Sequence, residues 1–127
     1  FSDVDGRYRG MDKEIHNSNF LQYTVFSLWD TYRATHPLYT ILEPQRTTDF
    51  IHTFKHQYDD GKILPIWELA GNYTGCMIGY HAIPVIADAY FKNLTDIPAD
   101  TLLEMMLTSA NQDKLGLKAY KKNGYIS

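Results

Sequence analysis

Cysteine, positive charge and long apolar runs are scarce in this 127-residue sequence. Cys76 is the single cysteine, so no disulfide can form within the chain. No apolar run approaches the roughly 20 residues that a membrane-spanning helix needs. Lys and Arg number 12 against 15 Asp and Glu, which gives a net charge of −3 and argues against a general phosphate-binding surface. We therefore expect no nucleic-acid partner and no membrane span.

The composition is that of a folded domain. Hydrophobic residues make up 44% and charged residues 21% of the chain, which is enough to build a core. Aromatic residues are plentiful, with ten Tyr, six Phe and two Trp. Aromatic surfaces suit carbohydrate or protein partners, although Tyr is equally common in cores. The chain begins at Phe1 without a methionine, and we expect residues 1–127 to be one partial domain of a longer protein.

Helical spacing dominates the sequence after Thr35. It predicts helices over residues 35–42, 44–58, 79–92, 98–112 and 114–122. The second of these has a narrow apolar stripe, whereas residues 82–91 are apolar on almost every side and predict a buried helix. Alternation of half-exposed and buried helices favours an all-α fold made of helical hairpins, as in an (α/α)6 toroid, over a plain bundle.

The two ends of the chain carry weaker signals. Asp5-Gly6 is a turn signal, and residues 6–11 are expected to pair with residues 20–28 as a small N-terminal β-hairpin. Near the other end, four residues of the 98–112 helix, Leu102, Leu103, Met106 and Leu107, are expected to line its inner face with Ala110. Together with helix 82–91, these side chains present more apolar surface than two or three helices can cover among themselves. We therefore expect the isolated chain to self-associate or to exist only with the remainder of its protein.

Residues 66–81 form a polar and aromatic stretch with no clean period, and we expect a long loop there. Loops held by a rigid scaffold often carry binding and catalytic groups. The alternative is a loop whose Trp and Met fill a core.

Two aromatic-acid pairs are the main candidates for chemistry. Asp30 follows Trp29 and could accept hydrogen bonds from sugar hydroxyls beside an indole; alternatively it caps a helix and pairs with Arg33. Trp67-Glu68 repeats the pattern. Glu68 could act as a general acid, a base or a hydroxyl ligand, or be an ordinary loop glutamate.

Further candidates are weaker. His81 could bond a substrate oxygen or satisfy a nearby carbonyl. Asp88, within the apolar helix, is expected to be buried with a partner on another helix. Cys76 would need His81 as a base to serve as a nucleophile.

Metal ligands are not assigned to any residue. His52 and His56 have ligand spacing but lack a third ligand, and Asp59-Asp60 alone does not make a calcium loop.

Five ordered segments resemble glycoside hydrolase family 92, the calcium-dependent, inverting, exo-acting α-mannosidases. They are residues 3–10 (DVDGRYRG), 26–37 (FSLWDTYRATHP), 64–69 (LPIWEL), 76–82 (CMIGYHA) and 85–90 (VIADAY). The Trp-Asp-x-Tyr pattern is also similar to that of trehalases.

The resemblance implies that the chain is the early part of the α-toroid catalytic domain of a much longer enzyme. That enzyme would remove terminal α-linked mannose, with α-1,2 linkages expected, from N-glycans or mannans, in the periplasm or at the surface of a bacterium. The catalytic acid, the base and most calcium ligands are expected after residue 127, so the fragment alone would be inactive. The resemblance assigns substrate binding to Asp30 and, with it, to Trp29, Arg33, Trp67, Glu68 and His81. Both aromatic-acid pairs should then converge on one pocket, with Glu68 the second candidate for the acid.

Two other functions are compatible with the residues alone: a catalytically silent carbohydrate-binding module and a purely structural helical domain.

Overall fold

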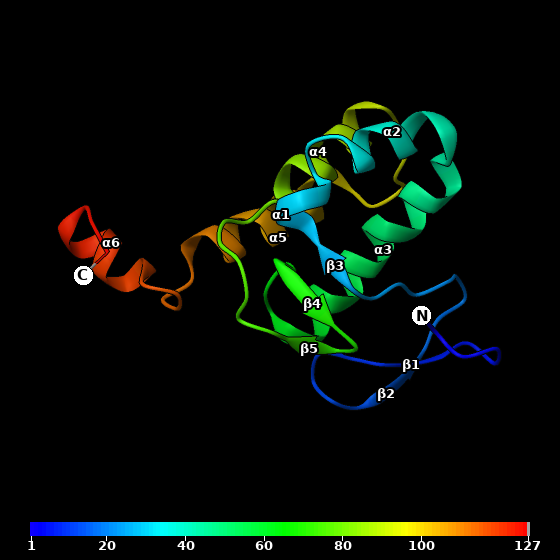
Figure 1. Ribbon diagram of the computed structural model, residues 1–127, viewed down its shortest axis with the longest axis horizontal. Coiled ribbons are helices and arrows are strands. Elements are labelled where there is room, and N and C mark those ends of the chain that lie inside the picture. The colour runs from blue at the N-terminus through cyan, green and yellow to red at the C-terminus, as the bar shows by residue number, and fades with distance from the viewer. Residues whose placement is uncertain (127) are drawn as a thin grey trace.

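A computed structural model describes residues 1–126, and helices dominate it (Figure 1). The helices are α1 (Leu28–Thr31), α2 (Thr35–Leu42), α3 (Pro44–Gly61), α4 (Ala82–Phe91), α5 (Ala99–Asn111) and α6 (Leu117–Asn123). The strands are β1 (Arg7–Arg9), β2 (Ile15–Asn17), β3 (Phe26–Ser27), β4 (Trp67–Leu69) and β5 (Asn72–Tyr73). Within the described residues, no helix is both long and apolar enough to cross a bilayer.

Two small antiparallel sheets modify the expected all-α fold. Strand β1 pairs with β2, and a separate three-stranded sheet has the order β3-β4-β5. The expected pairing of residues 6–11 with residues 20–28 is therefore wrong. The hairpin turn lies near Lys13, which adopts a positive φ of 79°, and residues 26–27 pair instead with residues 67–68. Part of the predicted loop 66–81 is thus the hairpin β4-β5.

Helix α3 is the centre of the core. Pro44 opens its first turn, where the missing N–H costs nothing, and Lys62 in the left-handed conformation ends it. The predicted apolar stripe is confirmed, because Phe50, Ile51 and Phe54 are buried and pack with residues of β3, α1, α4 and α5. The bounds of α2, α3, α4 and α5 lie within three residues of those predicted.

Helix α4 is buried on one face only. Ala82, Val85, Ile86 and Ala89 are buried, whereas Phe91 is 81% exposed. The expectation that Asp88 is buried with a partner on another helix is wrong. Asp88 is only partly buried and accepts a hydrogen bond from Lys92 at the end of its own helix, α4 (2.8 Å). Lys92 also donates to Thr40 of α2 at 2.9 Å, so the connection between helices runs through the lysine.

The inner face of α5 differs from the prediction. Leu102, Met105 and Ser109 are buried, whereas Leu103 is 51% exposed and Leu107 is also exposed. The reason is a buried polar residue: the Ser109 hydroxyl accepts a hydrogen bond from the Leu64 N–H at 2.9 Å. A serine on the core face breaks the apolar pattern from which the face was predicted.

His36 of α2 is a buried titratable group within the aromatic core. Its side chain is 6% exposed, and its ring centroid lies 5.3 Å from that of Phe50 and 6.4 Å from that of Phe54. Nδ1 has no hydrogen-bond partner among the described residues. Burial lowers the pKa of His36 from 6.5 to about 4, since desolvation penalises the charged imidazolium.

This burial predicts a loss of stability on acidification. The unfolded chain binds a proton at His36 below pH 6.5, whereas the folded chain does so only near pH 4. The contribution of neutral His36 to the free energy of unfolding is therefore fully present above pH 6.5 and is lost as the pH falls from 6.5 to about 4. Over this range the free energy of unfolding falls by about 1.4 kcal/mol per pH unit. Urea denaturation at pH 7 and pH 5 should show a wild-type loss that exceeds that of His36→Phe by about 2 kcal/mol. Equal losses in the two proteins would contradict the role of His36.

Candidate functional site

Helix α1 presents the first aromatic-acid pair at the surface. Leu28 is fully buried and its N–H donates to the Ile66 carbonyl at 3.3 Å, which fixes the start of the helix against β4. With Leu28 pointing inward, the next two side chains, Trp29 and Asp30, are exposed. A buried leucine therefore determines the outward position of the candidate pair.

Asp30 is held by its own turn and not by Arg33. The Ser27 hydroxyl donates a short hydrogen bond to Asp30 Oδ2. Neither an Asp30–Arg33 ion pair nor a side-chain cap from Ser27 to α1 occurs among residues 1–126. The Arg33 guanidinium instead lies over two rings, 5.4 Å from the centroid of Trp29 and 5.0 Å from that of Tyr32. Asp30 thus keeps acceptor capacity that is open to solvent or to a ligand.

His81 joins the same group through Tyr32. The two rings are stacked, with centroids 4.2 Å apart and planes 6° from parallel. Trp29, Arg33, Tyr32 and His81 consequently form a continuous stack beside Asp30. We call these five residues the α1 stack. Tyr32 was not among the predicted site residues, although its place in the Trp-Asp-x-Tyr pattern was the available signal.

Trp67 lies on the same side of the sheet as the α1 stack. Strands β3 and β4 pair so that Ser27 is directly opposite Trp67, and directly opposite residues share a sheet face. Because Ser27 also contacts Asp30, the indole of Trp67 and the carboxylate of Asp30 belong to one face. The strand pairing therefore brings together the two segments that were predicted to converge.

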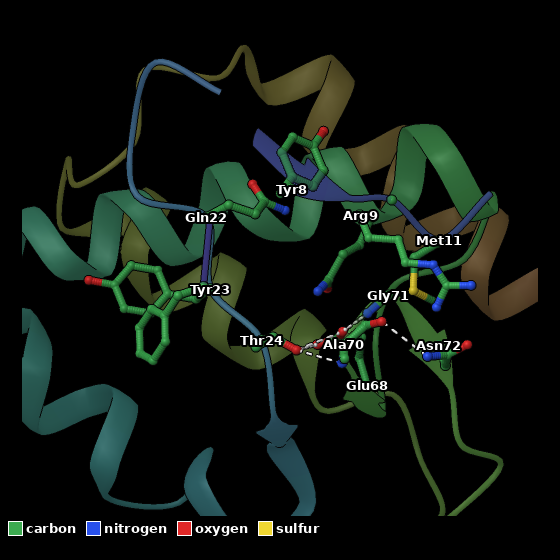
Figure 2. Close-up of a pocket in the computed structure, with 13 residues that line it drawn as sticks. Tyr8, Arg9, Met11, Gln22, Tyr23, Thr24, Glu68, Ala70, Gly71 and Asn72 are labelled. Atoms are coloured by element: carbon green, nitrogen blue, oxygen red, sulfur yellow. Dashed lines mark hydrogen bonds between the residues drawn. The ribbon is translucent and has the colours of Figure 1, made fainter. Parts of the chain in front are cut away.

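Glu68 points to the other face of the sheet. Glu68 is 1% exposed, and its carboxylate accepts hydrogen bonds from the Thr24 hydroxyl (2.9 Å), the Val25 N–H (3.2 Å) and the Gly71 N–H (2.6 Å). Figure 2 shows Thr24 and Gly71 beside Glu68, at the edge of an open cavity of about 280 Å³. The carboxylates of Asp30 and Glu68 do not share a pocket, so that expectation is wrong, for the simple reason that successive strand residues alternate between faces.

The turn between β4 and β5 brings the Gly71 N–H close to the Glu68 carboxylate. We call this carboxylate with its three donors the Glu68 anchor. Gly71 has a φ of +70°, and a Cβ there would lie 2.7 Å from the Arg9 carbonyl and 2.8 Å from the Gly10 carbonyl. Only glycine allows this turn to approach β1 so closely. The role of Glu68 as a general acid would require it to give up one of its hydrogen bonds.

The two histidines with ligand spacing bind different polar partners. His52 contacts Asp96 (2.7 Å) and His56 contacts Gln22 (3.1 Å), so the two histidines have different partners. Cys76 is exposed and its N–H donates to the Thr74 hydroxyl at 3.2 Å.

The one group of three His, Cys, Asp or Glu side chains with ligand geometry among the described residues is Asp12, His16 and Asp60. It lies on the hairpin side of α3, away from the α1 stack, and sequence spacing gave no sign of it.

Comparison with known proteins gives a consistent result. The family model described as the glycosyl hydrolase family 92 catalytic domain matches residues 1–127. A structure of the family GH92 alpha-mannosidase BT3965 from Bacteroides thetaiotaomicron is 42% identical in sequence, with a TM-score of 0.90 over 99% of this chain. A structure of the same enzyme in complex with mannoimidazole is also 42% identical, with a TM-score of 0.89. No curated protein matches.

The match covers a small part of the relative. This chain spans 18% of the first of those structures and 17% of the second. The family model, by contrast, matches the chain from end to end, and the identity is well above the level at which only a fold is shared. The chain belongs to glycoside hydrolase family 92, as part of its catalytic domain.

Proposed function

We propose that the α1 stack and Trp67 bind the terminal mannose of an α-mannoside in an exo-acting, inverting mannosidase. The observation that carries the proposal is the exposed Asp30 carboxylate, which is oriented by Ser27 and flanked by aromatic rings. Ionised carboxylates accept hydrogen bonds from hydroxyl groups, and an indole face suits the apolar side of a sugar ring. Family membership and the mannoimidazole complex of the relative support the substrate class.

Catalysis needs more than these residues. Inverting glycosidases use two carboxyl groups about 6.5–9.5 Å apart, one as acid and one as base. Asp30 and Glu68 cannot form such a pair, because Glu68 is buried on the other face of the sheet from Asp30. We therefore propose that the acid and base lie in the remainder of the enzyme, and that residues 1–127 supply the part of the pocket that binds the sugar.

Calcium is the cofactor that the family implies. Calcium takes six to eight oxygen ligands. No three Asp, Glu, His or Cys side chains come together around Asp30 among the described residues, so these side chains do not make a calcium site on their own. We propose that the calcium ligands of the enzyme are mostly outside this chain.

The finer features of the enzyme are likewise proposals. They are a preference for α-1,2 linkages, N-glycans or mannans as substrates, and a periplasmic or cell-surface location. The second candidate function is a catalytically silent carbohydrate-binding or structural module. An assay of mannose release from a mannobiose separates the two, because a binding module gives no turnover.

Asp30 is the residue on which to test the pocket. In the complete enzyme, Asp30→Ala should lower kcat/KM by about 10- to 100-fold, because a hydrogen bond between a charged group and a substrate hydroxyl is lost. Glu43→Ala is the matched control, since Glu43 is also an exposed acid at the start of a helix, makes no side-chain cap hydrogen bond there, and should leave kcat/KM unchanged. Wild-type kinetics for Asp30→Ala would remove its assigned role.

Glu68 should show the opposite signature. Glu68→Ala leaves three donors without their acceptor, two of them backbone N–H groups, and should lower the free energy of unfolding by at least about 2 kcal/mol. Glu104→Ala, at an exposed position of α5, should change it by less than about 0.5 kcal/mol. Urea denaturation measures both. A Glu68→Ala protein of full stability but without activity would restore Glu68 as the candidate acid.

The apolar face of α4 and α5 predicts association of the isolated chain. Phe91, Leu103 and Leu107 are exposed beside a groove of about 230 Å³ between the two helices. We propose that a second copy covers this face, or that the remainder of the enzyme does. Sedimentation should show oligomers that Leu103→Glu reduces and Ile15→Glu, on β2, does not. A monodisperse wild-type monomer would contradict this prediction.

A further inference from the structure

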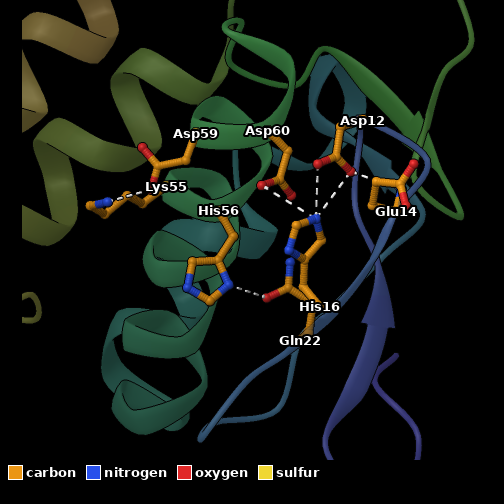
Figure 3. A network of polar contacts seen from close by, with 8 residues as sticks. All are labelled: Asp12, Glu14, His16, Gln22, Lys55, His56, Asp59 and Asp60. Carbon is orange, nitrogen blue, oxygen red and sulfur yellow. Dashed lines mark hydrogen bonds and ion pairs between the residues drawn. The ribbon is translucent and has the colours of Figure 1, made fainter.

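Three side chains from two distant parts of the chain meet beside Gly10. Asp12 comes from the turn between β1 and β2, His16 from β2, and Asp60 from the C-terminal end of α3 (Figure 3). We call them the Asp-His-Asp cluster. His16 Nε2 lies 2.9 Å from Asp12 Oδ2 and 4.0 Å from Asp60 Oδ1, and one ligand atom of each residue lies within 4.8 Å of the other two.

Asp60 has an oxygen that the protein leaves unused. Oδ2 is buried and has no hydrogen-bond partner among residues 1–126. The Asp60 side chain as a whole is also largely buried, with 12% exposed. A buried carboxylate oxygen without a partner costs free energy, and native structures usually satisfy such an atom with a protein group, a water or an ion. Burial also raises the pKa of Asp60. The orphaned oxygen marks a place for a ligand.

Gly10 shows where the three side chains point. A Cβ at this buried position would lie 2.6 Å from Asp12 Oδ1, 2.6 Å from Asp60 Oδ2 and 2.8 Å from His16 Cδ2. Asp12, His16 and the orphaned oxygen of Asp60 therefore border one small space over the glycine backbone. A side chain there would fill it.

The cluster also lacks compensating charge. In the described residues, no lysine or arginine pairs with Asp12 or Asp60. Two lysines close to these aspartates in the sequence are engaged elsewhere: Lys13 donates to the Gly71 carbonyl and Asn72 Oδ1, both at 2.7 Å, and Lys55 pairs with Asp59. Two carboxylates thus face one histidine, an arrangement that attracts a cation.

We propose that the Asp-His-Asp cluster binds a divalent transition metal ion of the zinc class. An imidazole nitrogen with two carboxylates suits zinc or its first-row neighbours and leaves room for a water, whereas calcium prefers an all-oxygen set of six to eight ligands. The bound ion would connect the β1-β2 hairpin to the end of α3, so its role is structural. The site is separate from the proposed sugar pocket and does not depend on it.

The alternative occupant is a proton. A protonated His16 could bridge the two carboxylates without any metal, and the experiment must separate these states. The variants are His16→Ala and the nearly isosteric Asp60→Asn, which retains the side-chain volume. The matched control is His52→Ala, because His52 of α3 also contacts an aspartate, Asp96 between α4 and α5, but is not part of a three-ligand group among the described residues.

The test is a zinc titration of the complete enzyme. The protein is stripped with a chelator, saturated with calcium and titrated with Zn²⁺ by calorimetry, and Co²⁺ absorption then reports the ligand field. We expect wild type and His52→Ala to bind one more equivalent of zinc than His16→Ala and Asp60→Asn, or to bind it at least 100-fold more tightly. Melting temperatures should rise with zinc only in the first two proteins.

Two outcomes would overturn the proposal. Equal zinc binding by all four proteins would place the metal elsewhere. No zinc binding by the wild type would mean that the cluster holds a proton only.

Discussion

The pairing of β3 with β4 is the constraint on which the candidate sugar site depends. Two residue pairs form it, with Phe26 opposite Glu68 and Ser27 opposite Trp67. A ladder this short has few hydrogen bonds of its own, and isolated two-stranded pairs are marginal in water. The buried Glu68 carboxylate adds what the ladder lacks, because it holds the residues before β3 and the turn after β4 at the same time. One side chain thus connects segments more than 40 positions apart.

The same pairing separates structural from binding groups. Alternation along β4 places Glu68 inside, among backbone donors, and Trp67 on the side of Ser27 and Asp30. A shift of the register by one residue would exchange these faces and bury the indole where the carboxylate now lies. A polar anchor with three specific donors resists that shift better than an apolar side chain would, since the shifted carboxylate would lose all of them. The register of β4 is therefore protected by chemistry that takes no part in sugar binding.

The sequence predicted what repeats along the chain and missed what does not. Helix α3 was predicted correctly because Phe50, Ile51 and Phe54 recur at helical spacing over several turns. Strands of two or three residues, such as β3 and β5, are too short to show any period. Glu68 looked like a loop acid for this reason.

Site geometry was predictable only where neighbours in the chain supply it. Trp29, Asp30 and Arg33 lie within one short helical segment, so their proximity followed from the sequence, yet the preference of Arg33 for two aromatic rings over Asp30 did not. The Asp-His-Asp cluster is the extreme case. Asp60 is 44 positions from His16, and no local pattern relates a hairpin strand to the end of a later helix.

The attachment of the N-terminal hairpin to the domain also supports the register of β4. Strands β1 and β2 have three residues each and exposed outer faces, so little apolar burial holds them to the domain. What attaches them is mostly polar or aromatic: Lys13 reaches the β4-β5 turn, and Tyr8 lies against His16 and stacks on His56 of α3. Burial and the negative charges of the nearby aspartates, Asp60, Asp12 and Asp59, raise the pKa of Tyr8 to about 12, which keeps the phenol neutral in this contact. Because the Gly71 turn that completes the Glu68 anchor rests on the carbonyls of residues 9 and 10, the attachment of the hairpin and the register of β4 support each other.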